Sequence, residues 1–154
     1  GWFVAAVAIL VVLAMSDLLD GTMARLSGTS GPWGNFLDAT LDRLADGAIF
    51  GGLVLYGAFH GQPWLAAGAT FALVTGQVTS YAKARAEAVG ATANVGIAER
   101  AERLIVTGVA VLLAGLGVPY VLPVVLWILG GLGLVTIGQR IWAVRGQLRV
   151  PPTR

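Results

Sequence analysis

The amino-acid sequence predicts an all-α integral membrane protein, a bundle of five transmembrane helices in this chain, on three observations. Hydrophobic residues make up 56% of the 154 residues, and 22 more residues are glycine. Charged residues make up only 12%, against about 25% in an average soluble domain. Apolar stretches long enough to cross a bilayer recur along the chain with short breaks between them. An ordinary soluble domain of this size is excluded, because it could not bury so much apolar surface.

The apolar pattern predicts five spans in chain order. The first extends from residue 1 to about 25, and the second from about 34 to 59. The third covers residues 63 to about 85, the fourth about 100 to 117, and the fifth 120 to about 142. We expect residues 1–154 to form a single transmembrane domain that is truncated at both ends, because apolar sequence begins at Gly1 without a polar lead and the tail Pro151-Pro152-Thr153-Arg154 looks cut off.

The charged residues predict the orientation of the bundle. If successive helices alternate in direction, all eight acidic and all ten basic residues lie on or nearest one membrane face. The loops of the opposite face carry no formal charge. Cytoplasmic loops are enriched in lysine and arginine, so the charged face is predicted to be cytoplasmic. The sequence therefore predicts a multi-pass protein of the cell (inner) membrane whose functional site faces the cytoplasm.

Four aspartates gather at the cytoplasmic ends of the first two spans. Asp17 and Asp20 are three residues apart and Asp38 and Asp42 four apart, so each pair shares one helical face. Four anions in one place repel one another unless protons or cations separate them. Oxygen ligands without cysteine or histidine suit Mg²⁺, or Mn²⁺. Two such ions would clamp a diphosphate.

Neighbouring residues fit a site of this kind. The small residues Gly21, Ala24 and Gly34 would let a ligand approach the backbone closely. The alternative is that the aspartates only pair with nearby arginines, which explains one aspartate more readily than four on two facing helices. For Asp46, one turn beyond Asp42, we expect an ion pair with Arg43 or a supporting role rather than metal ligation.

These residues resemble a known signature. The pattern is Asp17-x2-Asp20-Gly21-x2-Ala24-Arg25-x8-Gly34-x3-Asp38-x3-Asp42. It resembles the complete signature of the CDP-alcohol phosphotransferase family, membrane enzymes that transfer a substituted phosphate from a CDP-linked lipid to an alcohol and release CMP. The resemblance implies that the four aspartates bind the metal ions and that Asp42 is also the general base. It implies that Gly21, Ala24 and Gly34 make room for the cytidine nucleotide and that Arg25 pairs with its diphosphate. It also implies a homodimer and a core of six helices, of which this chain would lack the first.

A basic cluster at the same cytoplasmic level predicts an anionic acceptor. Its members are Ser80, Lys83, Arg85, Arg100, Arg103 and Arg140. Arginine forks match phosphate oxygens, which favours binding of an acceptor phosphate by Lys83, Arg103 and Arg140, with Ser80 as a further donor. The alternative is that these bases are topology signals and contact anionic lipids, and we adopt it for Arg145, Arg149 and Arg154.

Residues 80–87 and 97–104 and the pair at 139–140 resemble actinobacterial phosphatidylinositol phosphate synthases, which join CDP-diacylglycerol to inositol 1-phosphate. In that subfamily the residues that match Ser80, Lys83, Arg103 and Arg140 would hold the inositol phosphate. Glycerol 3-phosphate, which gives phosphatidylglycerol phosphate, is the alternative acceptor. A cation-coupled transporter is the remote alternative, but it predicts acids throughout the membrane depth. No nucleic-acid motif is present, so the predicted partners are the CDP-lipid, a sugar- or polyol-phosphate, membrane lipids and a second copy.

Overall fold

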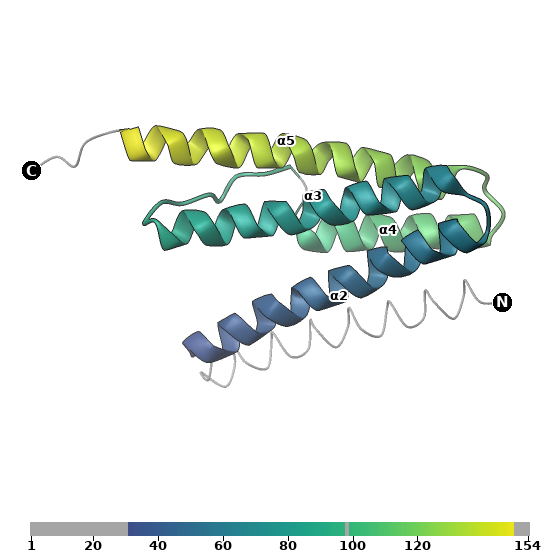
Figure 1. The fold of residues 1–154 in the computed structure, drawn as a ribbon, viewed down its shortest axis with the longest axis horizontal. Helices are drawn as coiled ribbons and strands as arrows, with labels where there is room; N and C mark the ends of the chain where they lie inside the picture. The colour runs from purple at the N-terminus through teal and green to yellow at the C-terminus, as the bar shows by residue number, and fades with distance from the viewer. Residues whose placement is uncertain (1–30, 98, 150–154) are drawn as a thin grey trace, which may run out of the picture.

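The computed structural model describes residues 31–97 and 99–149, which form four helices (Figure 1). They are α2 (Pro32–Phe59), α3 (Pro63–Ala88), α4 (Arg100–Gly115) and α5 (Val121–Arg149). The all-α prediction is confirmed for these residues. The predicted first span lies outside them, so the count of five helices stays a prediction. Five of the predicted site residues also lie outside the described residues: Asp17, Asp20, Gly21, Ala24 and Arg25.

The helix boundaries follow from local sequence. Pro32 and Pro63 stand in the first turns of α2 and α3, where the missing N–H group of proline leaves no helical hydrogen bond unmade. Gly61 and Gly117 adopt φ angles of 64° and 91° in the two turns that follow α2 and α4. Only glycine adopts this left-handed conformation without strain, so both turns can be tight.

Successive helices run in opposite directions (Figure 1). The α2–α3 and α4–α5 turns lie at one end of the bundle, and the start of α2 and the ends of α3 and α5 lie towards the other. The core includes Phe50, Leu65, Ala69, Leu122 and Leu126. Among the described residues, the charged side chains belong to the end of the bundle opposite these turns, as the sequence predicts.

Small residues allow α3 and α5 to pack closely. A Cβ atom added at Gly133 would lie 2.6 Å from the hydroxyl oxygen of Thr75. A Cβ atom at Gly130 would overlap the ring of Phe71. The close approach places the charged end of α5 directly beside the end of α3.

Within the described residues, α5 is the one helix that is long and apolar enough to cross a membrane by length and composition. The spans predicted over residues 34–59, 63–85 and 100–117 do form helices, but α4 has only 16 residues. Large apolar side chains such as Phe59, Ile105 and Trp142 are exposed on the outside of the bundle. An outer surface of this kind is consistent with a lipid-facing bundle, while the crossing of the membrane by α2, α3 and α4 stays a prediction.

The connection between α3 and α4 (residues 89–97) returns along the bundle beside α5, so that α4 begins midway along α3 (Figure 1). Gln147 on α5 accepts from the backbone N–H of Thr92 at 2.9 Å and donates to its carbonyl oxygen at 2.7 Å. Farther along, the backbone N–H of Ile97 donates to the hydroxyl of Thr136 at 3.3 Å. These bonds hold the connection on α5 and bring the N-terminus of α4 into the interior.

Candidate functional site

A cavity of about 870 Å³ lies among α2, α3, the start of α4 and α5. We call it the main cavity. Its charged lining residues are Arg43, Lys83, Arg100, Arg103, Arg140, Asp42, Glu87 and Glu99. Five cations against three acids leave an excess of positive charge, which suits an anionic ligand.

The main cavity brings together five of the predicted site residues, and they come from four helices. Asp42 comes from α2, Ser80 and Lys83 from α3, Arg103 from α4 and Arg140 from α5. The predicted general base and the whole predicted acceptor-phosphate group therefore line one space.

Asp46 does not line the main cavity itself, but it forms a buried ion-pair cluster with three arginines that do. Its side chain is 2% exposed. Oδ1 accepts from Nε of Arg100 at 3.2 Å, and Oδ2 lies 3.0 Å from Nη2 of Arg103 and 3.4 Å from Nη1 of Arg43. The expected pair of Asp46 with Arg43 is confirmed. Arg100 and Arg103 are partners of Asp46 that were not predicted from the sequence, although their spacing of three residues places them on one face of α4.

Asp42 lies one turn before Asp46 on α2 and pairs with a different nitrogen atom of Arg100. Nη1 of Arg100 lies 2.7 Å from Oδ1 of Asp42, and Nη2 of Arg43 lies 3.9 Å from Oδ2. Arg100 therefore bridges the two carboxylates of α2. Arg100 belongs to the predicted basic cluster, where the sequence gives it no specific role, and in the structure it lines the main cavity and contacts both Asp42 and Asp46.

Arg103 is 4% exposed and reaches α3 where that helix has no side chain. A Cβ atom at Gly76 would overlap the guanidinium group of Arg103, so only glycine leaves space for it there. The Nε of Arg103 is buried and has no hydrogen-bond partner in the part of the chain that the structure describes. A buried donor without a partner is rare, and a bound anion or water would satisfy it.

The α2–α3 side of the main cavity is tied together by side-chain hydrogen bonds. Nη1 of Arg43 donates to the hydroxyl of Ser80. Gln77 donates to the backbone carbonyl of Arg43 at 3.0 Å. Lys83, one turn beyond, lines the same space and is exposed.

Arg140 holds the α3–α4 connection against α3. Its Nε donates to the carbonyl oxygen of Val95 at 2.9 Å, and its Nη1 donates to the carbonyl oxygen of Thr79 at 2.5 Å. The side chain is 9% exposed and lines the main cavity. Part of its hydrogen-bonding capacity therefore serves the fold.

Asp38 and Gly34 are exposed on α2, and Asp38 lies one turn before Asp42. Among residues 31–97 and 99–149 there is no group of three or more acidic, histidine or cysteine residues that could hold a metal ion. Asp38 and Asp42 contribute carboxylate oxygens, the donors that hard divalent ions take, so the described half of the predicted ligand set fits such an ion. The other half, Asp17 and Asp20, lies outside the described residues.

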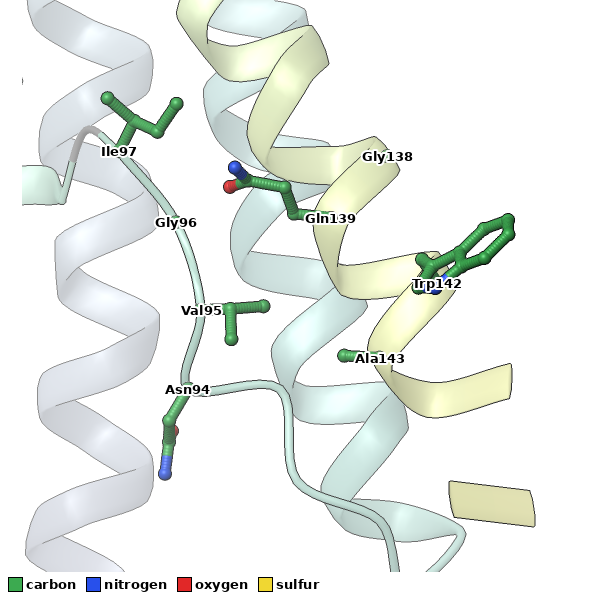
Figure 2. Close-up of a pocket in the computed structure, with 8 residues that line it drawn as sticks. All are labelled: Asn94, Val95, Gly96, Ile97, Gly138, Gln139, Trp142 and Ala143. Atoms are coloured by element: carbon green, nitrogen blue, oxygen red, sulfur yellow. The ribbon is translucent and has the colours of Figure 1, made fainter. Parts of the chain in front are cut away.

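A second cavity, of about 670 Å³, lies between the α3–α4 connection and α5 (Figure 2). Figure 2 shows Val95 and Ile97 on the connection facing the Gln139 and Ala143 side of α5. None of its lining residues carries a charge, and none is a predicted site residue. The main cavity is therefore the candidate active site.

Comparisons with known proteins point to one family. The model of the CDP-alcohol phosphatidyltransferase family matches residues 1–139. The phosphatidylinositol phosphate synthase of Streptomyces avermitilis is 48% identical over 145 residues, which cover 89% of this chain and 59% of that protein. The protein of the same name from Mycobacteroides abscessus is 47% identical over 136 residues, with 87% and 62% covered. The chain thus spans roughly three fifths of the length of these curated relatives.

The fold is similar to solved structures as well. The crystal structure of Mycobacterium tuberculosis phosphatidylinositol phosphate synthase with CDP-diacylglycerol bound matches with a TM-score of 0.85 and 38% identity. The match covers 92% of this chain and 73% of that one. The same enzyme in complex with manganese and citrate also matches with a TM-score of 0.85, over 93% of this chain and 70% of that one.

Proposed function

Since the chain belongs to the CDP-alcohol phosphatidyltransferase family, we propose that it transfers the phosphatidyl group of CDP-diacylglycerol to inositol 1-phosphate, releasing CMP and giving phosphatidylinositol phosphate. The observation that carries the proposal is the main cavity, where Asp42 shares one space with Ser80, Lys83, Arg103 and Arg140. The curated relatives at 48% and 47% identity carry the name of this activity.

The proposed reaction is an in-line displacement at phosphorus. The acceptor hydroxyl oxygen forms a bond to the phosphorus of the phosphatidyl group, and the bond from that phosphorus to the bridging oxygen of the diphosphate breaks. CMP leaves with the electron pair. Asp42 takes the proton of the acceptor hydroxyl, a role that its position beside the acceptor-phosphate group supports.

The basic residues of the main cavity bind the acceptor. Lys83, Arg103 and Arg140 offer charge and N–H donors to its phosphate, and Ser80 offers a hydroxyl. Holding the phosphate there fixes the acceptor hydroxyl near Asp42, which turns a bimolecular encounter into a positioned reaction. Arg100 lines the same cavity and pairs with the carboxylate of Asp42 at 2.7 Å, which holds that carboxylate in place.

The lipid substrate would be held on the side of Asp42 that faces away from the acceptor-phosphate residues. Asp17, Asp20, Asp38 and Asp42 would hold divalent ions, Mg²⁺ or Mn²⁺ and two in number, which neutralise the diphosphate when bound. Gly21, Ala24 and Gly34 would make room for the cytidine nucleotide, and Arg25 would pair with the diphosphate. The M. tuberculosis enzyme has been crystallised with CDP-diacylglycerol and with manganese, which supports this part of the proposal.

In the cell, the proposal places the protein in the inner membrane as a multi-pass homodimer with the main cavity open to the cytoplasm. CDP-diacylglycerol then arrives through the lipid and the polar acceptor arrives from the cytosol. The gathering of charge at one end of the bundle supports this arrangement.

The test is CMP release by the purified full-length protein with CDP-diacylglycerol and Mg²⁺. Inositol 1-phosphate, glycerol 3-phosphate and unphosphorylated inositol are supplied in parallel reactions. We expect release with inositol 1-phosphate and little with inositol, because the basic residues bind the phosphate. Release with glycerol 3-phosphate alone would replace the proposed acceptor by that alcohol, and no release with any acceptor would overturn the proposed activity.

A further inference from the structure

Asp46 has a place in the molecule that neither metal ligation nor acceptor binding explains. It is buried at 2% exposure, and it does not line the main cavity. Both of its carboxylate oxygens are taken by arginines, Oδ1 by Arg100 and Oδ2 by Arg103 and Arg43. All three of these arginines do line the cavity.

Three guanidinium groups this close repel one another strongly, because the interior of a protein screens charge poorly. Asp46 is the carboxylate that all three share, and together with Asp42, which pairs with Arg43 and Arg100, it offsets that repulsion. A guanidinium group carries five N–H donors, so each arginine has donors besides those that face Asp46, some of which bind Asp42 and Ser80. The buried Nε of Arg103 is one such donor that no described residue satisfies.

We propose that Asp46 is a positioning residue of the acceptor site: it holds Arg43, Arg100 and Arg103 together so that their remaining donors serve the phosphate of the acceptor. The inference rests on the proposed function, because it assigns an anionic acceptor to the main cavity. It adds Arg43 and Arg100 to the residues that recognise the phosphate.

Removing the charge of Asp46 can change the affinity for the acceptor phosphate in two opposite directions, according to whether net charge or the placement of the arginines dominates. Without Asp46 the cavity wall becomes more positive, and charge alone would then strengthen phosphate binding. If positioning dominates, the arginines move apart and phosphate binding weakens. The sign of the change in acceptor affinity therefore decides between the two.

The experiment replaces Asp46→Asn in the full-length protein. Steady-state CMP release gives the KM for inositol 1-phosphate and the KM for CDP-diacylglycerol. The thermal midpoint with and without inorganic phosphate gives a second readout that does not depend on activity. We expect the acceptor KM to rise about tenfold, the KM for the lipid to stay within about twofold, and the stabilisation by phosphate to shrink.

Two further variants sharpen the result. Asp46→Glu keeps the charge but moves the oxygens by one methylene group, so its acceptor KM should lie between those of the wild type and Asp46→Asn. Thr107→Val is the matched control, because Thr107 is a buried α4 residue, 1% exposed, whose hydroxyl has no partner among the described residues. Its acceptor KM should equal that of the wild type.

The outcomes separate this inference from the proposed function. If the wild-type protein neither gains stability from phosphate nor turns over, the anionic acceptor site itself is wrong. If the wild-type protein does both and Asp46→Asn leaves the acceptor KM unchanged or lowers it, the positioning role is overturned. If Asp46→Asn fails to fold, Asp46→Glu decides, and an acceptor KM equal to that of the wild type would overturn the role.

Discussion

At the scale of single residues, Arg140 shows how one side chain serves both the fold and the site. It donates to the carbonyl oxygens of Val95 and Thr79, and it lines the main cavity. The sequence indicates a base at this level of the bundle, but it carries no information on backbone carbonyls that approach only after folding. The sequence therefore predicts that Arg140 lies in the site, and the structure confirms this position, whereas its two backbone contacts could not be predicted.

Arg140→Lys keeps the charge and removes the fork that reaches two carbonyl oxygens. We expect the acceptor KM to rise about tenfold, and the thermal midpoint to fall by about 5 °C because the buried bond to Thr79 and the part-buried bond to Val95 cannot both be kept. Arg145→Lys on the same helix is the control, because Arg145 is exposed and should tolerate the change. An unchanged thermal midpoint in Arg140→Lys would contradict the view that Arg140 stabilises the fold by linking the α3–α4 connection to α3.

Asp42→Asn removes the proposed general base with almost no change in shape. Turnover should fall about a thousandfold, while CDP-diacylglycerol binding is largely retained, because the other three proposed metal ligands are unchanged. Binding is measured with the lipid alone, and turnover by CMP release. Loss of lipid binding together with normal residual chemistry would assign Asp42 to the lipid rather than to the proton.

At the scale of elements, the site depends on where α4 begins. The sequence predicts a helix from about residue 100, and the structure confirms this start, which Glu99 and Glu102 cap reciprocally. The course of the α3–α4 connection along α5 was not predictable, because it depends on contacts such as that of Thr92 with Gln147, 55 residues away. The cluster around Asp46 likewise joins residues 54 and 57 positions apart.

Gly76→Ala tests the fit of α4 against α3. The added methyl group overlaps the guanidinium group of Arg103, which must then leave its place against α3. We expect a rise of roughly tenfold in the acceptor KM with the KM for CDP-diacylglycerol unchanged. Gly108→Ala is the matched control on α4, where a Cβ atom meets no described atom within 4 Å. Equal acceptor KM values in the two variants would show that Arg103 does not need the space at Gly76.

At the scale of the whole molecule, the described helices carry their charge at one end and apolar side chains over the rest. Composition and helix alternation are sufficient to predict this polarity, because a charge deep in a bilayer is costly wherever it lies. How acids and bases divide within that end depends on helix packing. In the structure they meet where Arg100 contacts both Asp42 and Asp46.

The proposed site has a basic half, which consists of the acceptor-phosphate residues with Arg43 and Arg100, and an acidic half, which consists of the four proposed metal-binding aspartates. We expect the two halves to respond differently to metal removal. The basic half is built by α2, α3, α4 and α5 through contacts that involve protein groups alone, including the Asp46 cluster and the bonds of Arg140. The acidic half would need divalent ions to hold the lipid diphosphate. A chelator should therefore abolish CMP release while the stabilisation of the protein by inorganic phosphate persists, and added Mg²⁺ should restore turnover. The thermal midpoint with phosphate, measured before and after chelation, checks this. If chelation also removes the effect of phosphate, the anion is bound through the metal ions, and the basic half is not an independent acceptor site.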